Sequence, residues 1–179
     1  MNATFVRNNL KCAAALLLSL VGIAAAAGQP SVRATLLSAK ERKAASDFSL
    51  KDASGKTVVI KDYRGKVVLL NFWATWCGGC KEELPWFAEF ERKYGRKGLA
   101  VVGVSLDDGG WNVVKPFLAK TDVPFQILLG DDATAKLYRI EAMPDTFLID
   151  RRGKVATAYA GLVDKDNVEA NLKALLGEH

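Results

Sequence analysis

The sequence predicts a single α/β domain built around a central mixed β-sheet. Two stretches, residues 67–73 and 99–106, are almost continuously apolar, which is typical of strands covered on both faces. Between them, residues 79–94 place apolar side chains at helical spacing among Lys, Glu and Arg. This alternation indicates βαβ units with parallel strands. Two later strands flank a short turn at residues 150–153 and must be antiparallel, so the sheet is mixed.

The remaining elements follow from the same periodicities. Phe48 and Leu50 alternate with polar residues, Ser54-Gly55 signals a turn, and residues 58–60 are apolar again, which predicts a β-hairpin at the start of the domain. The sequence then predicts, beyond residue 106, a helix over 111–120, a strand over 125–129, a helix over 133–140, strands over 146–149 and 155–160, and a last amphipathic helix over 166–176.

Composition and charge agree with one ordinary globular domain. Of the 179 residues, 50% are hydrophobic and 25% are charged, with 15 Gly and 5 Pro. This balance excludes a disordered or collagen-like chain. A chain of roughly 150 residues buries about 68–70% of its unfolded surface, which is enough for one core. The 25 Lys and Arg side chains against 20 Asp and Glu fall short of a clustered basic excess, so we expect no nucleic-acid partner.

The N-terminus has the pattern of a secretory signal. Arg7 and Lys11 precede an uncharged stretch of mostly Ala and Leu, which ends in small residues before Gly28. Its core of about 16 residues is shorter than the ~20 that a membrane span needs. We therefore expect residues 1–27 to be a signal peptide, with a retained N-terminal anchor as the alternative. Both interpretations place the domain outside the cytoplasm, and only the second attaches it to a membrane.

Residues 28–46 are expected to be a tether or a frayed N-terminal arm. They mix charged residues, Ala and Ser with no steady period. We therefore expect the folded domain to begin near Asp47 and to span residues 47–179.

Two cysteines, Cys77 and Cys80, remain once Cys12 has left with the leader. A disulfide across so short a loop constrains little of the unfolded chain, so stability is a poor reason for the pair. Zinc needs about four protein ligands, whereas the mature chain offers these two Cys and the terminal His179. We therefore expect no metal site. Paired thiols oxidise readily outside the cytoplasm, so the pair indicates redox chemistry.

The position of this Cys-x-x-Cys pair assigns its chemistry. It lies where the strand over 67–73 gives way to the helix over 79–94. The free N–H groups and partial positive charge of a helix N-terminus favour a thiolate at Cys77. One helical turn later, Cys80 can attack a mixed disulfide formed at Cys77 and release the partner protein. We therefore expect Cys77 to be the nucleophile, Cys80 the resolving thiol, and the redox-active disulfide to need no cofactor.

Three segments, in order, carry a resemblance to a known family. They read VVLLNFWATWCGGCKEELPWF, then VVGVSLDD, then MPDTFLIDRRGKV. Together they resemble the TlpA/ResA type of thioredoxin-like thiol-disulfide oxidoreductases over most of residues 47–176. The resemblance implies a thioredoxin-like three-layer fold with an N-terminal β-hairpin and a βα insertion at roughly residues 107–130. It also implies a periplasmic enzyme that exchanges disulfides with protein substrates.

The biological role implied by the resemblance is that of a reductant in cytochrome c or respiratory-oxidase assembly. Such a reductant is expected to be regenerated by a membrane-embedded thiol donor. The sequence alone leaves the direction of electron flow open.

The resemblance further favours Glu83 as the carboxylate that exchanges a proton with the resolving thiol. Glu83 lies three residues after Cys80 and therefore on the same side of the helix. Asn71 occupies the strand position where minimal thioredoxins have a buried Asp, and an amide cannot act as that base. The alternative is that Glu83, like Glu82, is a solvated residue that complements the helix dipole.

Substrate contacts are implied at Trp76, Met143 and Pro144. Trp76, next to the nucleophile, corresponds to an exposed lip of the family's site. The resemblance implies a cis Met143-Pro144 bond beside the cysteines, where the Met143 backbone pairs with an extended substrate. A Met side chain there would make the contact adaptable.

The sequence departs from the family pattern at Gly78-Gly79, where x-Pro is usual. Proline before the second Cys would fix φ and withhold an N–H group, and glycine does neither. We expect these two glycines to tune the redox potential, in a direction that the sequence does not fix.

Two other functions fit the sequence less well than disulfide exchange. A peroxiredoxin needs Thr three residues before its Cys, whereas Thr75 lies two residues before Cys77. A copper-delivery module of the same fold would use the Cys pair with further His or Met ligands, and Met143 is the only Met after the leader. Copper delivery stays as the alternative function.

Overall fold

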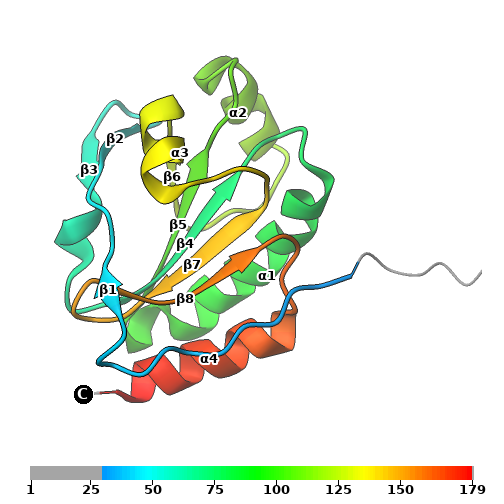
Figure 1. Cartoon of the computed structure of the whole chain (residues 1–179). Helices are drawn as coiled ribbons and strands as arrows, with labels where there is room; N and C mark the ends of the chain where they lie inside the picture. The colour runs from blue at the N-terminus through cyan, green and yellow to red at the C-terminus, as the bar shows by residue number, and fades with distance from the viewer. Residues whose placement is uncertain (1–29, 179) are drawn as a thin grey trace, which may run out of the picture.

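The computed structural model describes residues 30–178 and shows a sheet between two helical layers (Figure 1). One face of the sheet is covered by α1 (Gly78–Tyr94) and α4 (Lys165–Gly177). The other face is covered by α3 (Asp132–Tyr138) and the 3₁₀ turn η1 (Ile60–Tyr63). The predicted three-layer α/β fold is confirmed.

The sheet is mixed, with strand order β1-β8-β7-β4-β5-β6-β2-β3. β4 pairs parallel with β5 and antiparallel with β7, and β2 and β3 form the predicted hairpin. The strands are β1 (Lys43–Ala44), β2 (Ser49–Asp52), β3 (Thr57–Val59), β4 (Val67–Trp73), β5 (Leu99–Ser105), β6 (Gln126–Leu129), β7 (Asp145–Ile149) and β8 (Lys154–Ala160). The remaining elements are the short 3₁₀ helix η2 (Gly95–Lys97) and the helix α2 (Trp111–Leu118). Of these two, α2 lies within the expected insertion.

The central strand β4 organises both layers of the core, and all seven of its residues are buried. Alternate side chains of a strand point to opposite faces. Val67, Leu69 and Trp73 therefore join the apolar cluster that includes α1 and α4. Val68, Leu70 and Phe72 join the cluster that includes Tyr138 of α3.

The active-site elements meet at the C-terminal end of β4. The chain leaves β4 after Trp73 and enters α1 within a few residues. Because β7 runs antiparallel to β4, its first residue, Asp145, pairs with Phe72 at this same end. The predicted Met143-Pro144 segment therefore lies next to the predicted Cys77–Cys80 pair.

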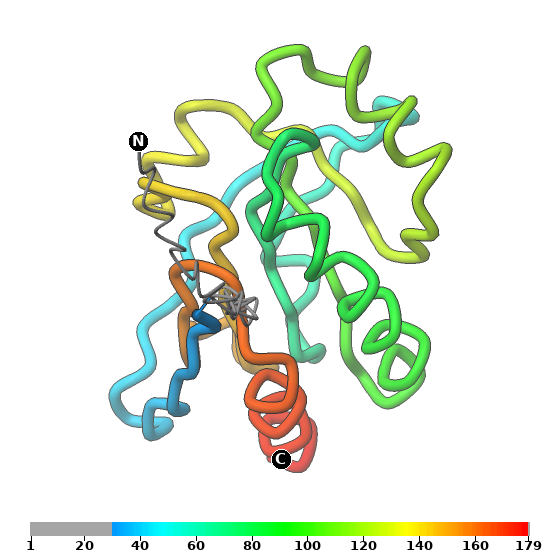
Figure 2. Tube along the Cα trace, turned by 90° about the vertical axis from the view of Figure 1, so that its right-hand side faces the viewer, coloured from blue at the N-terminus to red at the C-terminus, as the bar shows by residue number. Residues whose placement is uncertain are grey.

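The expected tether over residues 28–46 is contradicted in its described part, residues 30–46. Figures 1 and 2 show this arm running beside α4 and the strand β8. Val32, Ala34 and Leu36 pack against the core, and the residues between them are exposed. The arm is held in place because its apolar side chains alternate like those of a half-buried strand.

Polar contacts at the end of the arm also contradict a domain start at Asp47. The Arg42 guanidinium is buried and donates to both carboxylate oxygens of Glu178, at 2.6 and 2.7 Å. It also donates to Asp150 at 3.2 Å. This cluster ties the arm to the β7–β8 turn and to the end of α4, so the arm belongs to the folded domain.

Replacing Arg42 with Met is expected to lower the free energy of unfolding by about 2 kcal/mol, because it leaves the buried Asp150 carboxylate without its cation. Glu178 is 44% exposed, so water can replace Arg42 as its partner and the loss of this contact adds little to the destabilisation. Urea denaturation of the variant measures the loss. Lys43→Met is the matched control, since Lys43 is the exposed neighbour. Equal stability of the two variants would contradict the assigned role of Arg42.

Candidate active site

Cys77 and Cys80 form a disulfide at the N-terminus of α1, with Cα atoms 5.3 Å apart. Cys77 is the N-cap residue, and its Sγ accepts a hydrogen bond from the Cys80 backbone N–H at 3.2 Å. Cys77 retains 6% exposure, whereas Cys80 is fully buried. A substrate can therefore reach the first sulfur before the second. In the reduced form, the helix N-terminus would stabilise a thiolate at Cys77.

The loop between β4 and α1 is held by the buried Asp107, which the sequence analysis did not single out. Its carboxylate accepts hydrogen bonds from the backbone N–H of Thr75, at 3.0 and 3.1 Å, and from the Thr75 hydroxyl, at 2.6 Å. The Ser105 hydroxyl donates to the same carboxylate at 2.8 Å. Asp107 thereby fixes the backbone two residues before Cys77.

Glu83 is fully buried, which contradicts the alternative of a solvated helix-dipole residue. Its Oε1 accepts a hydrogen bond from the Val163 backbone N–H at 2.8 Å, and its Oε2 accepts one from Asn71 Nδ2 at 3.3 Å. Asn71 also donates to the Thr146 hydroxyl at 3.0 Å. Burial outweighs these two bonds and raises the pKa of Glu83 to about 8.

A second carboxylate, Asp145, lies at the start of β7 directly after Pro144. It is buried, and burial raises its pKa to about 6. No role is predicted for this residue from the sequence, although an acidic residue that opens an apolar strand is a visible signal. The negative charge of Asp145 also contributes to the raised pKa of Glu83.

An open depression brings together most of the predicted site residues. The Met143-Pro144 bond is cis, as predicted. Trp76 stands at the rim with 67% of its surface exposed. The depression is lined by Pro30, Trp76, Cys77, Gly78, Gly79, Met143, Pro144, Gly161 and Leu162. Pro144 therefore faces the disulfide region, and the N-terminal arm contributes Pro30 to the wall.

Neither glycine of the Cys-Gly-Gly-Cys motif has a backbone conformation that requires glycine. A side chain at Gly78 would meet nothing within 4 Å. A Cβ atom at Gly79 would meet the Pro144 ring at 3.4 Å, which is an ordinary contact. Gly78 therefore borders open space, whereas Gly79 lies against the Pro144 ring.

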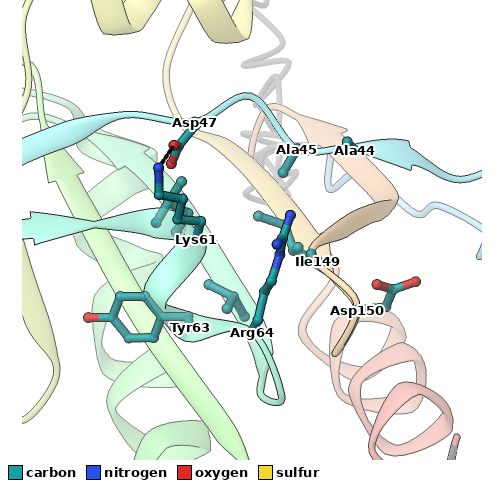
Figure 3. Close-up of a pocket in the computed structure, with 11 residues that line it drawn as sticks. Ala44, Ala45, Asp47, Lys61, Tyr63, Arg64, Ile149 and Asp150 are labelled. Atoms are coloured by element: carbon teal, nitrogen blue, oxygen red, sulfur yellow. Dashed lines mark ion pairs between the residues drawn. The ribbon is translucent and has the colours of Figure 1, made fainter.

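A separate pocket lies near the start of β4, at the end of the strand away from the cysteines. It is lined by residues that include Val68 of β4, Ile149 of β7 and Ala45. In Figure 3 the Arg64 side chain extends toward Ala45 and Ile149. An ion pair between Lys61 and Asp47 at 3.0 Å borders the pocket (Figure 3). This pocket contains neither redox cysteine.

Residues 30–178 contain no group of three or more His, Cys, Asp or Glu side chains arranged to hold a metal ion. No helix in the same part of the chain combines the length and apolarity that a membrane span needs. The predicted signal peptide lies outside the described residues.

Comparison with known proteins relates this chain to thiol–disulfide oxidoreductases. Residues 42–158 match the model of the AhpC/TSA family. The chain is 35% identical over 134 residues to thiol-disulfide oxidoreductase ResA of Bacillus thuringiensis subsp. konkukian, which covers 74% of this chain and 77% of that protein. It is 39% identical over 134 residues to ResA of Oceanobacillus iheyensis, with 72% and 69% covered.

Solved structures also relate this chain to thiol-disulfide oxidoreductases and thioredoxins. A thiol:disulfide interchange protein described as DsbE, from Chlorobium tepidum, matches with a TM-score of 0.72 and 38% identity, over 76% of this chain and 97% of that chain. The exposed lipoprotein thioredoxin Etrx1 of Streptococcus pneumoniae matches with a TM-score of 0.60 and 30% identity, over 72% of this chain and 99% of that chain.

In the reduced protein, iodoacetamide at neutral pH is expected to alkylate Cys77 before Cys80. Cys77 is the partly exposed N-cap residue, and Cys80 is fully buried behind it. Peptide mass spectrometry after short labelling times measures the order, with Cys77→Ser and Cys80→Ser as single-thiol controls. Faster labelling of Cys80 would reverse the assigned roles.

Proposed function

Because this chain belongs to the AhpC/TSA family and to the ResA thiol-disulfide oxidoreductases, we propose that it reduces disulfides of proteins in the periplasm. As a thiol-disulfide oxidoreductase, the protein acts on the thiols and disulfides of other proteins. The observation that carries the proposal is the Cys77–Cys80 disulfide at a helix N-terminus, next to an open depression. The secretory pattern of residues 1–27 supports the compartment, and so does the similarity to an exposed lipoprotein thioredoxin.

The first step is attack by the Cys77 thiolate on a substrate disulfide. A new bond forms between Cys77 Sγ and one substrate sulfur, and the other substrate sulfur leaves as a thiolate that takes up a proton. The Met143 backbone, next to the cis bond, would pair with the extended substrate, and the exposed Trp76 would cover it.

The second step is attack by Cys80 on Cys77 Sγ, which releases the second substrate sulfur and forms the Cys77–Cys80 disulfide. The protein dithiol is oxidised, and the substrate disulfide is reduced. Before the attack, Cys80 must lose its proton, and Glu83 accepts it in its ionised form, which is about a tenth of the population at pH 7 for a pKa of about 8. A pKa of about 8 is close to the ordinary thiol value of ~8.5, so the proton moves between the two groups at little cost.

Regeneration reverses this proton movement. A dithiol of a membrane-embedded donor attacks the disulfide, Cys80 leaves, and the protonated Glu83 returns the proton to it. At pH 7 a carboxyl with a pKa of about 8 is mostly protonated, which suits the donor role in the oxidised form seen here. The donor's two thiols become its disulfide, so electrons balance over the cycle.

The proposed clients are the cysteine pairs of proteins in cytochrome c or respiratory-oxidase assembly. This assignment rests on the resemblance of the three sequence segments to the TlpA/ResA type. Such pairs must be reduced before they bind haem or metal, in a compartment that oxidises thiols readily.

Cys80→Ser is expected to accumulate mixed disulfides between Cys77 and client proteins, because the resolving sulfur is missing. Non-reducing gels of cells that express the variant, followed by mass spectrometry, identify the clients. We expect cytochrome c or oxidase-assembly proteins among them. Cys77→Ser is the matched control and should trap far less. Equal trapping by both variants, or clients confined to unrelated proteins, would contradict the proposal.

Glu83→Gln is expected to slow release of the mixed disulfide by ~10²-fold, the lower end for loss of a general base. Alkylation of Cys77 should change much less. Stopped-flow thiol exchange measures the two steps separately, with Glu82→Gln as the control because Glu82 is exposed on the same helix. Small and equal effects of both changes would contradict the proton-transfer role of Glu83 and leave it a structural one.

A further inference from the structure

The group that holds Glu83 is itself held by the N-terminal arm. Glu83 Oε1 accepts its hydrogen bond from the Val163 backbone N–H at 2.8 Å. Val163 forms an isolated parallel bridge with Val32 of the arm. The Val32 N–H donates to the Leu162 carbonyl at 2.6 Å, and the Asp164 N–H donates to the Val32 carbonyl at 2.9 Å. Val32 thus binds the backbone on both sides of the residue that contacts Glu83.

The arm is anchored to α4 just beyond this bridge. The Ala34 N–H donates to Asn167 Oδ1 at 2.8 Å, and Asn171 Nδ2 donates to the Ala34 carbonyl at 2.9 Å. Arg33 pairs with Asp164 at 2.7 Å. Figure 1 shows the arm lying along α4 where these contacts form.

The segment clamped by the arm is the connection between β8 and α4. Its first residue, Gly161, donates its N–H to the Pro144 carbonyl at 2.9 Å, and its last, Asp164, caps α4 through the Asn167 N–H at 2.8 Å. β8 ends at Ala160, and α4 begins at Lys165. Two backbone groups of this connection, the Leu162 carbonyl and the Asp164 N–H, are occupied by Val32. Without the arm these groups would turn to water, and the Val163 N–H would lose its fixed direction.

We propose that residues 30–34 are a positioning element of the active site, which holds the Val163 N–H on the Glu83 carboxylate. The arm also reaches the substrate side of the site, because Pro30 lines the same depression as Cys77. The kinetic consequence of this inference rests on the proposed role of Glu83 in the release step.

The direction of the effect follows from the hydrogen bond. A backbone N–H stabilises the ionised carboxylate, and the bond from Val163 lowers the pKa of Glu83 against the larger effect of burial. Losing it would leave Glu83 protonated over a wider pH range and less able to accept a proton from Cys80. The two carboxylates whose negative charges raise the pKa of Glu83, Asp145 and Glu82, would stay in place.

The test is Val32→Pro, which removes the N–H that binds Leu162 and leaves the rest of the arm in the chain. The matched control is Thr35→Pro, because the Thr35 N–H makes no hydrogen bond within residues 30–178. A chain that starts at Thr35 is the second variant, which keeps β1 and the Arg42 cluster. Both arm variants are compared with a chain that starts at Pro30.

We expect at least tenfold faster hydrogen exchange at the Val163 amide in both arm variants, and an upward shift of the Glu83 titration midpoint. Release of the mixed disulfide should slow toward the rate of Glu83→Gln, while attack by Cys77 changes less than twofold. Thr35→Pro should match the unaltered chain. In a Glu83→Gln background, Val32→Pro should cause no further slowing.

Unchanged Val163 exchange in both variants would overturn the inference, and so would equal slowing of the attack and release steps. Additive slowing with Glu83→Gln would overturn it as well. If Glu83→Gln alone left release unaffected, the proposed role of Glu83 would fail. Val163 exchange and the Glu83 titration midpoint would then decide the role of the arm.

Discussion

Burial of the Glu83 carboxyl is the constraint on which the active site depends. A carboxyl group taken out of water needs polar partners, and separate segments of the fold supply them. Asn71 donates from the central strand β4, and Val163 donates from the β8–α4 connection. The arm then fixes Val163 through Val32. The helix that carries Glu83 also carries Cys77 and Cys80 at its first turn, so the same packing sets both the thiols and the proton acceptor.

This burial has an energetic cost that depends on pH. The pKa of Glu83 is about 8 in the folded protein against 4.5 for a solvated Glu. Between these values the folded state binds one more proton than the unfolded state, so the free energy of unfolding falls as pH rises through this window. The slope from one such group is at most about 1.4 kcal/mol per pH unit. Asp145, with a pKa raised to about 6, acts in the same direction. The site therefore gives up stability near neutral pH in return for a carboxyl whose pKa matches that of a thiol.

The sequence predicted the elements whose signals are local. The apolar run of β4, the helical period of α1 and the turn between β7 and β8 were each visible in a short window, and the structure has them within a residue or two. The cis bond before Pro144 came from the family resemblance. The arm was missed because its stability comes from Asn167 and Asn171 of α4, far away in the chain. Its only local signal was the alternation of Val32, Ala34 and Leu36. The role of Asp107 is hidden in the sequence because its carboxylate meets the Thr75 donors only where the ends of two parallel strands come together. The role of Val163 is hidden because it acts through its backbone N–H, which no residue type encodes.

The central claim is that Glu83 is a buried carboxyl that stays largely protonated at neutral pH. A ¹³C NMR titration of its side-chain carboxyl carbon in the oxidised protein tests this most directly. The signal is assigned by its loss in Glu83→Gln. A midpoint of about 8 agrees with the burial and hydrogen bonds of this residue. A midpoint near 4.5, the value of a solvated Glu, would contradict the account.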